Sequence, residues 1–147
     1  MKNIQDLIVK YPKIFVQHKL SMQETCMCWG IECGIGWYEL IDNLCSHLQW
    51  DIDHNGYPQI EAVQVKEKYG TLRFYINGGN DKQNGMISFA EFLSGAICEH
   101  CGSMDNVSQT KGWVVTLCKN CMEKRNNKTK GELNGWIFSV LFIKHQN

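Results

Sequence analysis

Four cysteines in the last third of the chain have the spacing of a structural zinc site. They form two Cys-x-x-Cys pairs, Cys98 with Cys101 and Cys118 with Cys121, separated by sixteen residues. Zinc prefers four tetrahedral ligands, and two residues between paired cysteines let a tight turn direct both sulfurs at one ion. Four sulfurs also leave no coordination position for a reactive water. The spacing therefore predicts one structural Zn²⁺ ion rather than a catalytic metal.

A disulfide bond and a thioredoxin-like redox pair are the alternatives for these cysteines. The segment 1–6 carries charges and amides where a signal peptide needs an apolar stretch, so we expect a cytoplasmic protein. The reducing cytosol favours metal binding over disulfides. Neither pair lies in a strand-to-helix unit typical of the redox fold. No apolar run has the length of a membrane span, and we expect no membrane partner.

Four further cysteines, Cys26, Cys28, Cys33 and Cys45, lie at irregular spacings in the first third of the chain. A second metal site is one interpretation, because Cys-x-Cys pairs occur as metal ligands. The other is ordinary core packing, since a free cysteine behaves as a small hydrophobic residue. Cys45 falls on the apolar face of a predicted helix, which favours core packing, and the sequence leaves the metal alternative open.

The elements that must position these residues indicate an α+β fold. Hydrophobic residues make up 44% of the 147 residues and charged residues 20%, which is enough apolar material for a real core. We predict an α+β core region over residues 1–97 in which helices pack on a β-hairpin. A four-cysteine zinc module follows over residues 98–130. Residues 131–147 are predicted to form an apolar strand that packs on the core or on another chain.

Hydrophobic periodicity predicts the elements of the core region. Apolar residues at helical spacing predict a short amphipathic helix within residues 1–12 and a second helix from Trp37 to Leu48. Alternating apolar and polar residues predict a hairpin of strands Ile60–Lys66 and Leu72–Ile76. We predict a third helix over Ile87–Ile97, directly before the first cysteine pair.

The zinc module has its own predicted order of elements. Residues 98–102 form a zinc knuckle, Val107–Thr110 and Trp113–Leu117 form a hairpin, and a helix begins at Cys118. This order is that of a treble clef, and a zinc ribbon is the alternative. The dense apolar run 136–143 either packs within the fold or mediates homo-oligomerisation.

Two groups of residues could bind a partner. Fifteen basic residues balance fifteen acidic ones, so no global field attracts nucleic acid. The predicted hairpin nevertheless combines cations with aromatic rings, and a second basic group surrounds the last cysteine. Such combinations hold phosphates and stack bases, although a solvated strand face has the same pattern. The candidate residues are Lys66, Lys68, Tyr69, Arg73 and Tyr75 on the hairpin, and Lys119, Lys124, Arg125, Lys128 and Lys130 near the module.

The sequence predicts no catalytic site. Treble-clef nucleases of the His-Asn-His type need histidines on the hairpin and the following helix, whereas residues 107–130 contain none. No serine has a nucleophile-elbow context, and the chain has neither a phosphate-binding loop nor a dinucleotide fingerprint. We therefore expect a binding protein rather than an enzyme.

The chain resembles a group of small, uncharacterised proteins encoded by bacteriophages and prophages. The resemblance covers roughly residues 10 to 125, and its most distinctive part is the string Gln-Val-Lys-Glu-Lys-Tyr-Gly-Thr-Leu-Arg-Phe-Tyr over residues 64–75. Its other motifs are Cys33-x-x-Gly36-Trp37, Cys98-Glu99-x-Cys101-Gly102 and Gly112-Trp113-x-x-Thr116-Leu117-Cys118.

The resemblance implies the cytoplasm of a bacterial host cell. It also implies an accessory protein of a virus or mobile element, whose partner is a host protein, with a host-defence inhibitor as one case. The alternative is a nucleic-acid-binding protein that uses the basic residues near the zinc module. The sequence does not identify the partner, and a small-molecule or nucleotide ligand stays open.

Overall fold

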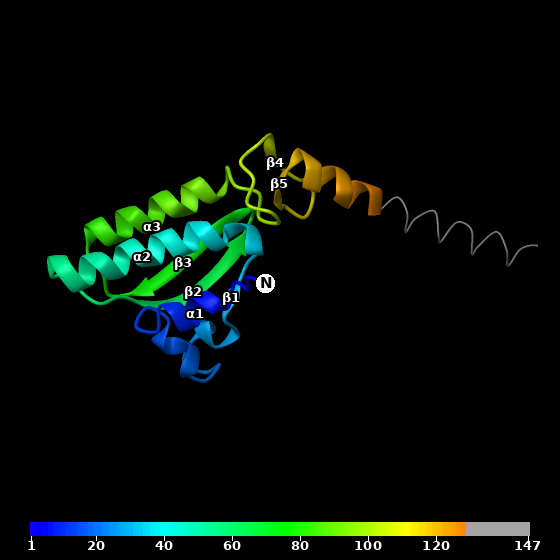
Figure 1. The fold of residues 1–147 in the computed structure, drawn as a ribbon. Helices are drawn as coiled ribbons and strands as arrows, with labels where there is room; N and C mark the ends of the chain where they lie inside the picture. Colours follow the sequence, from blue (N-terminus) through cyan, green and yellow to red (C-terminus); the bar gives the residue numbers. More distant parts are fainter. Residues whose placement is uncertain (129–147) are drawn as a thin grey trace, which may run out of the picture.

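The computed structural model describes residues 1–128 and has a mixed α+β fold, as the sequence predicts. We call residues 1–97 the body and residues 98–128 the C-terminal module. The body contains a three-stranded sheet of order β1-β2-β3 and three α-helices (Figure 1). Its elements are α1 (Asp6–Lys10), η1 (Val16–Lys19), η2 (Cys26–Trp29), β1 (Ile31–Glu32), η3 (Ile35–Trp37), α2 (Tyr38–Asn55), β2 (Glu61–Lys68), β3 (Thr71–Asn77) and α3 (Asp81–Ser94).

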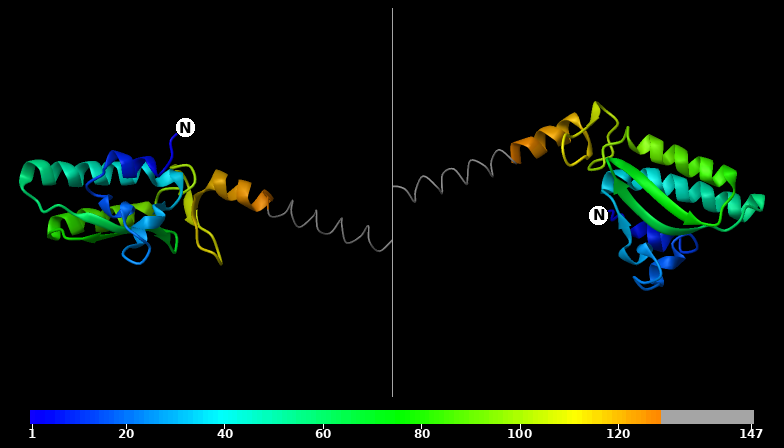
Figure 2. Two further views of the ribbon diagram at one scale, coloured as in Figure 1. Left: turned by 90° about the horizontal axis from the view of Figure 1, so that it is seen from below. Right: turned by 180° about the vertical axis from the view of Figure 1, so that it is seen from behind.

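The helices of the body cover one face and one edge of the sheet. Helix α2 lies across one face, whereas the right-hand view of Figure 2 shows the opposite face of β2 and β3 with no described helix in front of it. Helix α3 runs along β3, where Leu72 N–H donates to Ser94 Oγ over 2.8 Å and Phe74 N–H donates to Glu91 Oε1 over 2.8 Å. Side chains of α3 therefore accept hydrogen bonds from backbone N–H groups on the outer edge of β3, which would otherwise have no partner.

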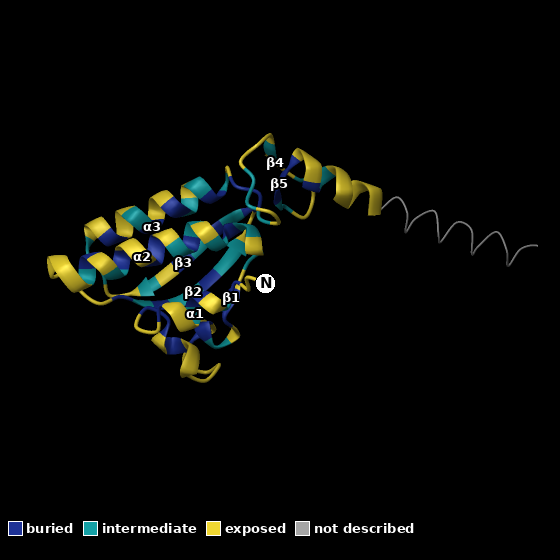
Figure 3. Cartoon of the chain, viewed as in Figure 1, coloured by how far each residue is buried: buried dark blue, intermediate teal, exposed yellow. Residues whose placement is uncertain are grey.

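The helix predicted from Trp37 to Leu48 is confirmed as α2. Trp37, Ile41, Cys45 and Leu48 are fully buried, and they recur at the spacing of one helix face. Figure 3 shows buried stretches recurring along α2 between exposed ones. The helix continues to Asn55 and ends at Gly56, whose left-handed conformation (φ 68°) is a common helix terminus.

The predicted β-hairpin is also confirmed. Strands β2 and β3 pair in antiparallel fashion, with Val65 opposite Phe74 and Lys66 opposite Arg73. The two-residue turn between them has positive φ angles at Tyr69 (53°) and Gly70 (80°), as a type I′ turn requires. Val65 and Phe74 are buried, and successive residues of a strand point to opposite faces, so Lys66 and Arg73 lie on the open face of the sheet.

The N-terminal segment supplies a helix and one strand. The predicted first helix is confirmed over the shorter range of α1. Strand β1 was not predicted, because it has two residues and pairs in parallel with β2. Its outer edge bonds the side chain of Gln5, whose Nε2 donates to Ile31 O over 2.8 Å and whose Oε1 accepts from Ile31 N–H over 3.0 Å. The side-chain amide of Gln5 therefore takes the place of a neighbouring strand on this edge of β1.

Helix α3 begins earlier than predicted. The expected range was Ile87–Ile97, whereas α3 starts at Asp81 and ends at Ser94. The reason is a capping box: Asn80 Oδ1 accepts from Gln83 N–H and Gln83 Oε1 accepts from Asn80 N–H, both over 2.9 Å. These two bonds satisfy free donors at the helix start and fix it there.

The C-terminal module contains a turn, a hairpin and a helix in the predicted order. The turn spans residues 98–102, and the antiparallel strands are β4 (Val107–Gln109) and β5 (Thr116–Cys118). A helix begins at residue 119, one position after the predicted start, and is described to residue 128. Lys130 and the predicted apolar strand 131–147 lie outside the described residues.

Candidate metal centre

The four predicted zinc ligands meet at one point of the C-terminal module. The sulfurs of Cys98, Cys101, Cys118 and Cys121 all lie within 4.8 Å of one another, and the Cys101 and Cys118 sulfurs are 3.7 Å apart. Sulfurs arranged tetrahedrally at about 2.3 Å from a zinc ion are about 3.8 Å apart. The arrangement is therefore compatible with a metal site. Within residues 1–128, no other group of three or more His, Cys, Asp or Glu side chains has such geometry.

Two local structures position the sulfurs. In the first, Gly102 N–H donates to Cys98 O and Cys98 N–H donates to Ser103 O, each over 2.8 Å, which closes the turn around the first pair. Gly102 has a φ of 80°, a conformation that favours glycine. In the second, Cys118 ends β5 and Cys121 lies in the first turn of the following helix. The strand-to-helix transition therefore presents the second pair to the first.

The electrostatics of the four thiols favour a bound cation. Burial opposes ionisation of Cys98, but backbone N–H groups of Cys118, Cys101 and His100 outweigh it and lower the pKa of Cys98 to about 7. Burial and the neighbouring sulfurs raise the pKa of Cys121 to about 12. One thiolate thus forms readily, whereas four thiolates at this spacing need the charge of a dication.

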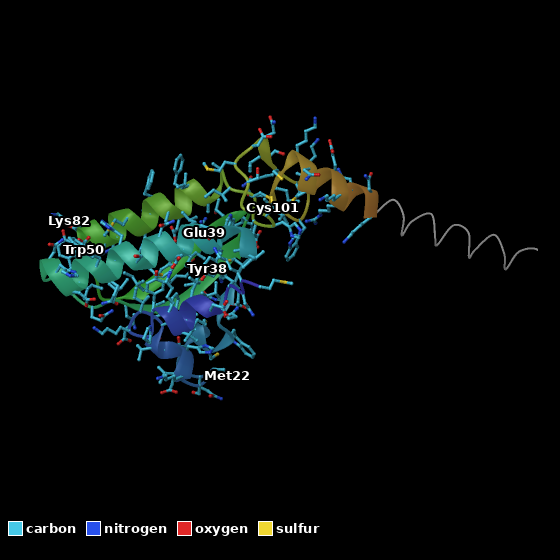
Figure 4. All side chains as sticks on the ribbon, viewed as in Figure 1. Met22, Tyr38, Glu39, Trp50, Lys82 and Cys101 are labelled. Carbon is cyan, nitrogen blue, oxygen red and sulfur yellow. The ribbon has the colours of Figure 1, made fainter. Side chains whose placement is uncertain are left out.

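The cysteine turn is bonded directly to the body. Gly36 N–H donates to Glu99 O over 2.8 Å, and the buried Trp37 Nε1–H donates to Ile97 O over 3.0 Å. A Cβ added to Gly36 would lie 2.2 Å from Cys98 O, so only glycine allows this approach. Figure 4 shows Cys101 in the module, beyond the N-terminal end of α2.

The hairpin turn of the body also touches the module. Thr116 Oγ1 donates to Gly70 O, and a Cβ added to Gly70 would lie 2.7 Å from Gln109 Nε2. Glu99 N–H in turn donates to Thr116 O over 2.9 Å. Strand β5 therefore connects the cysteine turn with the β2–β3 turn. Segments 33–37, 64–75, 98–102 and 112–118 therefore meet in this part of the molecule.

A cavity of about 930 Å³ lies where the module meets the body. We call it the module cleft. One side is the cation-bearing face of the helix that starts at residue 119, and another carries apolar side chains from the β4–β5 hairpin. The lining residues are Gly34, Glu67, Glu99, His100, Trp113, Val115, Leu117, Cys121, Lys124, Arg125, Asn127 and Lys128.

Two half-buried carboxylates in the module cleft were missed by the sequence reasoning. Gly70 N–H donates to Glu67 Oε1 over 2.6 Å, and Gly34 N–H donates to Glu99 Oε1 over 2.9 Å. Burial raises the pKa of Glu99, Gly34 N–H opposes this rise, and the charge of Glu67 adds to it. The only signal in the sequence was the glycines that fix these carboxylates, since the two acids are distant along the chain.

The predicted hairpin surface lies on the open face of the sheet. Lys66 is opposite Arg73, and Tyr75 follows on the same strand and face. Arg73 Nη1 donates to Thr71 Oγ1 over 2.7 Å and to Leu72 O over 2.8 Å, so the strand itself orients the guanidinium. Beyond these strand positions, Lys68 Nζ lies 5.6 Å from the ring centroid of Tyr69 at the turn.

The predicted basic group of the module has a different setting. Lys119, Lys124 and Arg125 are exposed on the helix that starts at residue 119. Lys124 and Arg125 line the module cleft together with the two glutamates, whereas none of the predicted hairpin residues does. The structure therefore assigns the two predicted groups to different surfaces.

The upstream cysteines do not gather into a metal cluster in the described part of the chain. Cys45 is fully buried in the core, as its place on the helix predicts, and burial raises its pKa. Cys33 is half-buried, and burial with the nearby charges of Glu99 and Glu67 raises its pKa to about 12. Cys26 is exposed on η2. Packing thus accounts for Cys45, and Cys33 is protected from ionisation.

Comparison with known proteins finds no matching family model, no matching curated protein and no matching solved structure. Within residues 1–128, none of the helices combines the length and the apolar character that crossing a membrane requires.

Proposed function

We propose that Cys98, Cys101, Cys118 and Cys121 bind one structural Zn²⁺ ion and that the module is a zinc treble clef. Turn, hairpin and helix occur in the order of that motif, and the second cysteine pair lies at the start of the helix. A zinc ribbon would need the second pair on another hairpin. Four thiolate ligands give a closed site that contributes to folding and not to catalysis.

Metal analysis tests this assignment. The purified protein should contain one zinc per chain, and Cys98→Ser should lose it. Cys26→Ser is the matched control, because Cys26 is exposed and outside the cluster, and it should retain the zinc. A metal-free native protein would refute the assignment.

We further propose that the protein is a non-enzymatic binding protein that engages a host protein. The observation that carries this proposal is the module cleft, which combines apolar walls with charged side chains, among them two half-buried carboxylates held by backbone N–H groups. Protein-binding sites join apolar contact area with a few oriented polar groups. The resemblance to phage and prophage proteins supports a bacterial cytoplasmic setting, with inhibition of a host defence protein as one case.

Affinity capture from a bacterial host extract, with and without nuclease, tests this role. A protein partner should remain bound after nuclease treatment. Trp113→Ala should weaken the interaction, because Trp113 is 78% exposed and lines the module cleft. Phe89→Ala is the control: Phe89 is also exposed, but it lies on α3 and outside the cleft. Capture that depends on Phe89 and not on Trp113 would contradict the proposal.

Nucleic-acid binding is the second candidate, and the open sheet face favours it. Lys66 and Arg73 face each other across the hairpin, with Tyr75 beside them, a combination that suits phosphates and bases. The exposed Lys119, together with Lys124, extends the positive charge onto the module. The two glutamates of the module cleft oppose this role there, because they repel phosphate.

Salt dependence separates the two candidates. Nucleic-acid affinity should fall steeply as salt rises, because each phosphate contact releases counterions. Changing Lys66 and Arg73 to Glu should abolish it, because these residues carry the proposed contact. Changing Lys124 and Arg125 to Glu should weaken it, and unchanged affinity in this second variant would reject the module as part of the nucleic-acid contact.

A further inference from the structure

Tyr69 has a backbone conformation that bulky residues rarely adopt. It is the first residue of the β2–β3 turn, and its φ of 53° lies in the left-handed region that such turns fill with asparagine, aspartate or glycine. An aromatic residue is unfavourable there, because its Cβ approaches the following carbonyl oxygen. Burial does not compensate for this cost, since Tyr69 is 73% exposed. Folding alone therefore does not explain a tyrosine at this position.

Three cations lie next to this turn on the open face of the sheet, which the right-hand view of Figure 2 shows. Lys66 pairs with Arg73 across the hairpin, and Lys68 follows on the same face because side chains alternate along a strand. Hydrogen bonds of Arg73 Nη1 to Thr71 Oγ1 and Leu72 O orient the guanidinium. Among the described residues, none of the three cations forms an ion pair. Their charge is therefore available to an anionic ligand.

The acidic residues nearby do not neutralise these cations. Glu32 lies beside Lys66 in the β1–β2 pairing, but it belongs to the edge strand and forms no ion pair with Lys66. Glu61 lies at the far end of β2, where its Oε2 accepts from Gln17 Nε2 over 2.9 Å. Glu67 alternates onto the opposite face and lines the module cleft. The half of the hairpin next to the turn therefore has an excess of positive charge, which complements a polyanion.

Aromatic rings lie at both ends of this group of cations. Tyr75 follows Arg73 on the same strand and face and is 41% exposed. At the other end, Lys68 Nζ lies 5.6 Å from the centroid of the Tyr69 ring. Proteins that bind single strands combine cations for the phosphates with aromatic rings on which bases stack. A duplex hides the faces of its bases within its own stack, whereas a single strand exposes them.

We propose that the open face of the sheet binds a single strand of nucleic acid. The phosphates contact Lys66, Lys68 and Arg73, and the bases stack on Tyr69 and Tyr75. This inference rests on nucleic-acid binding, the second candidate function, and adds the form of the nucleic acid and the role of the turn. An acidic peptide would pair with the cations but has no base to stack, so the two rings favour nucleic acid. None of these five residues lines the module cleft, and the two surfaces are therefore separate.

Fluorescence anisotropy at low salt tests this site in the full chain. The probes are a labelled single strand of about 16 nucleotides, as DNA and as RNA, the same DNA annealed with its complement, and a glutamate peptide of matched charge. At least one single strand should bind about ten-fold more tightly than the duplex and the peptide, because stacking on two rings adds to the phosphate contacts. Duplex or peptide affinity equal to that of the single strands, or no binding of any probe, would overturn the proposal.

Variants of the two tyrosines separate stacking from folding. Tyr69→Asn removes the ring but suits the left-handed turn, so thermal stability should be equal or higher, whereas single-strand affinity should fall about ten-fold. Tyr75→Phe keeps a ring and should retain the affinity, whereas Tyr75→Thr should lose it to a similar extent. Trp50→Ala is the control, because Trp50 is exposed on α2, across the opposite face of the sheet. Unchanged affinity in Tyr69→Asn, or lower stability of that variant, would also overturn the proposal.

Failure of this inference is distinguishable from failure of nucleic-acid binding itself. If duplex and single strand bind equally, and changing Lys66 and Arg73 to Glu abolishes both, the second candidate function stands and the single-strand site is wrong. If neither form binds, both fail. The proposed host-protein role is tested at Trp113 and is independent of either result.

Discussion

The body and the C-terminal module are held together by different means. The body buries large side chains such as Leu7, Phe15, Trp37 and Leu48 completely, in one continuous core. In the module, three of the four buried core residues are the sulfur ligands themselves, and Leu117 is the fourth. A segment of this size cannot supply enough apolar burial for independent stability. The difference indicates that the module depends on the zinc ion that we propose, whereas the body has a core of its own.

Replacing one of the four cysteines should have the largest effect, and this effect should be confined to the module. We expect Cys118→Ser to unfold the module and leave the body folded, because metal binding contributes on the order of 10 kcal/mol to small zinc domains. Amide hydrogen exchange should show lost protection in residues 98–128 and retained protection in α2 and β2. Cys26→Ser should leave both regions protected. Equal protection of the module in Cys118→Ser and the native protein would show that packing alone maintains it.

The converse change removes apolar volume from the body. Leu48→Ala should lower the free energy of unfolding by about 2–5 kcal/mol, because Leu48 is fully buried in α2 and its loss leaves a cavity. Urea denaturation measures the change, and the zinc content of the folded protein should not alter. Leu40→Ala, at a half-buried position of the same helix, should cost less. A larger loss from Leu40→Ala would contradict the assigned core.

A smaller effect is expected where the body contacts the module, at Gly36. Gly36→Ala should cost about 1–3 kcal/mol, because its Cβ would overlap Cys98 O and push the module from the body. Gly85→Ala is the control: a Cβ there meets nothing within 4 Å, and alanine favours the helix by up to about 1 kcal/mol. Thermal denaturation compares the two. Equal stability of both variants would mean that the module does not need this close approach.

The smallest expected effect lies at the start of α3. Asn80→Ala should cost about 1 kcal/mol, because it removes one half of the capping box. The loss should appear in urea denaturation of the body without a change in zinc affinity. Asn43→Ala, on the exposed side of α2, should change stability by less than about 0.5 kcal/mol. If both changes cost the same, the cap does not determine the start of α3.

Local patterns made much of the body predictable. The apolar spacing from Trp37 to Leu48 identified α2, and alternating residues identified the hairpin. The early start of α3 was also readable, because Asn80 and Gln83 have the spacing of a capping box. Strand β1 was not readable, since its two residues depend on pairing with β2 and on the distant side chain of Gln5.

The candidate sites also differ in whether a local sequence pattern could predict them. The gathering of Cys98, Cys101, Cys118 and Cys121 was predictable, because each pair is local and its spacing is that of metal ligands. The module cleft was not, because Glu67, Glu99 and Trp113 come from three separate segments that meet only in the folded chain. Gly34 and Gly36 let the cysteine turn approach the body, and no local pattern in the sequence indicates this role.

X-ray absorption at the zinc edge of the native protein tests the central claim most directly. We expect one zinc per chain with four sulfur neighbours at about 2.3 Å and no nitrogen or oxygen ligand. A zinc ion with nitrogen or oxygen in its coordination sphere, or a native chain without zinc, would contradict it.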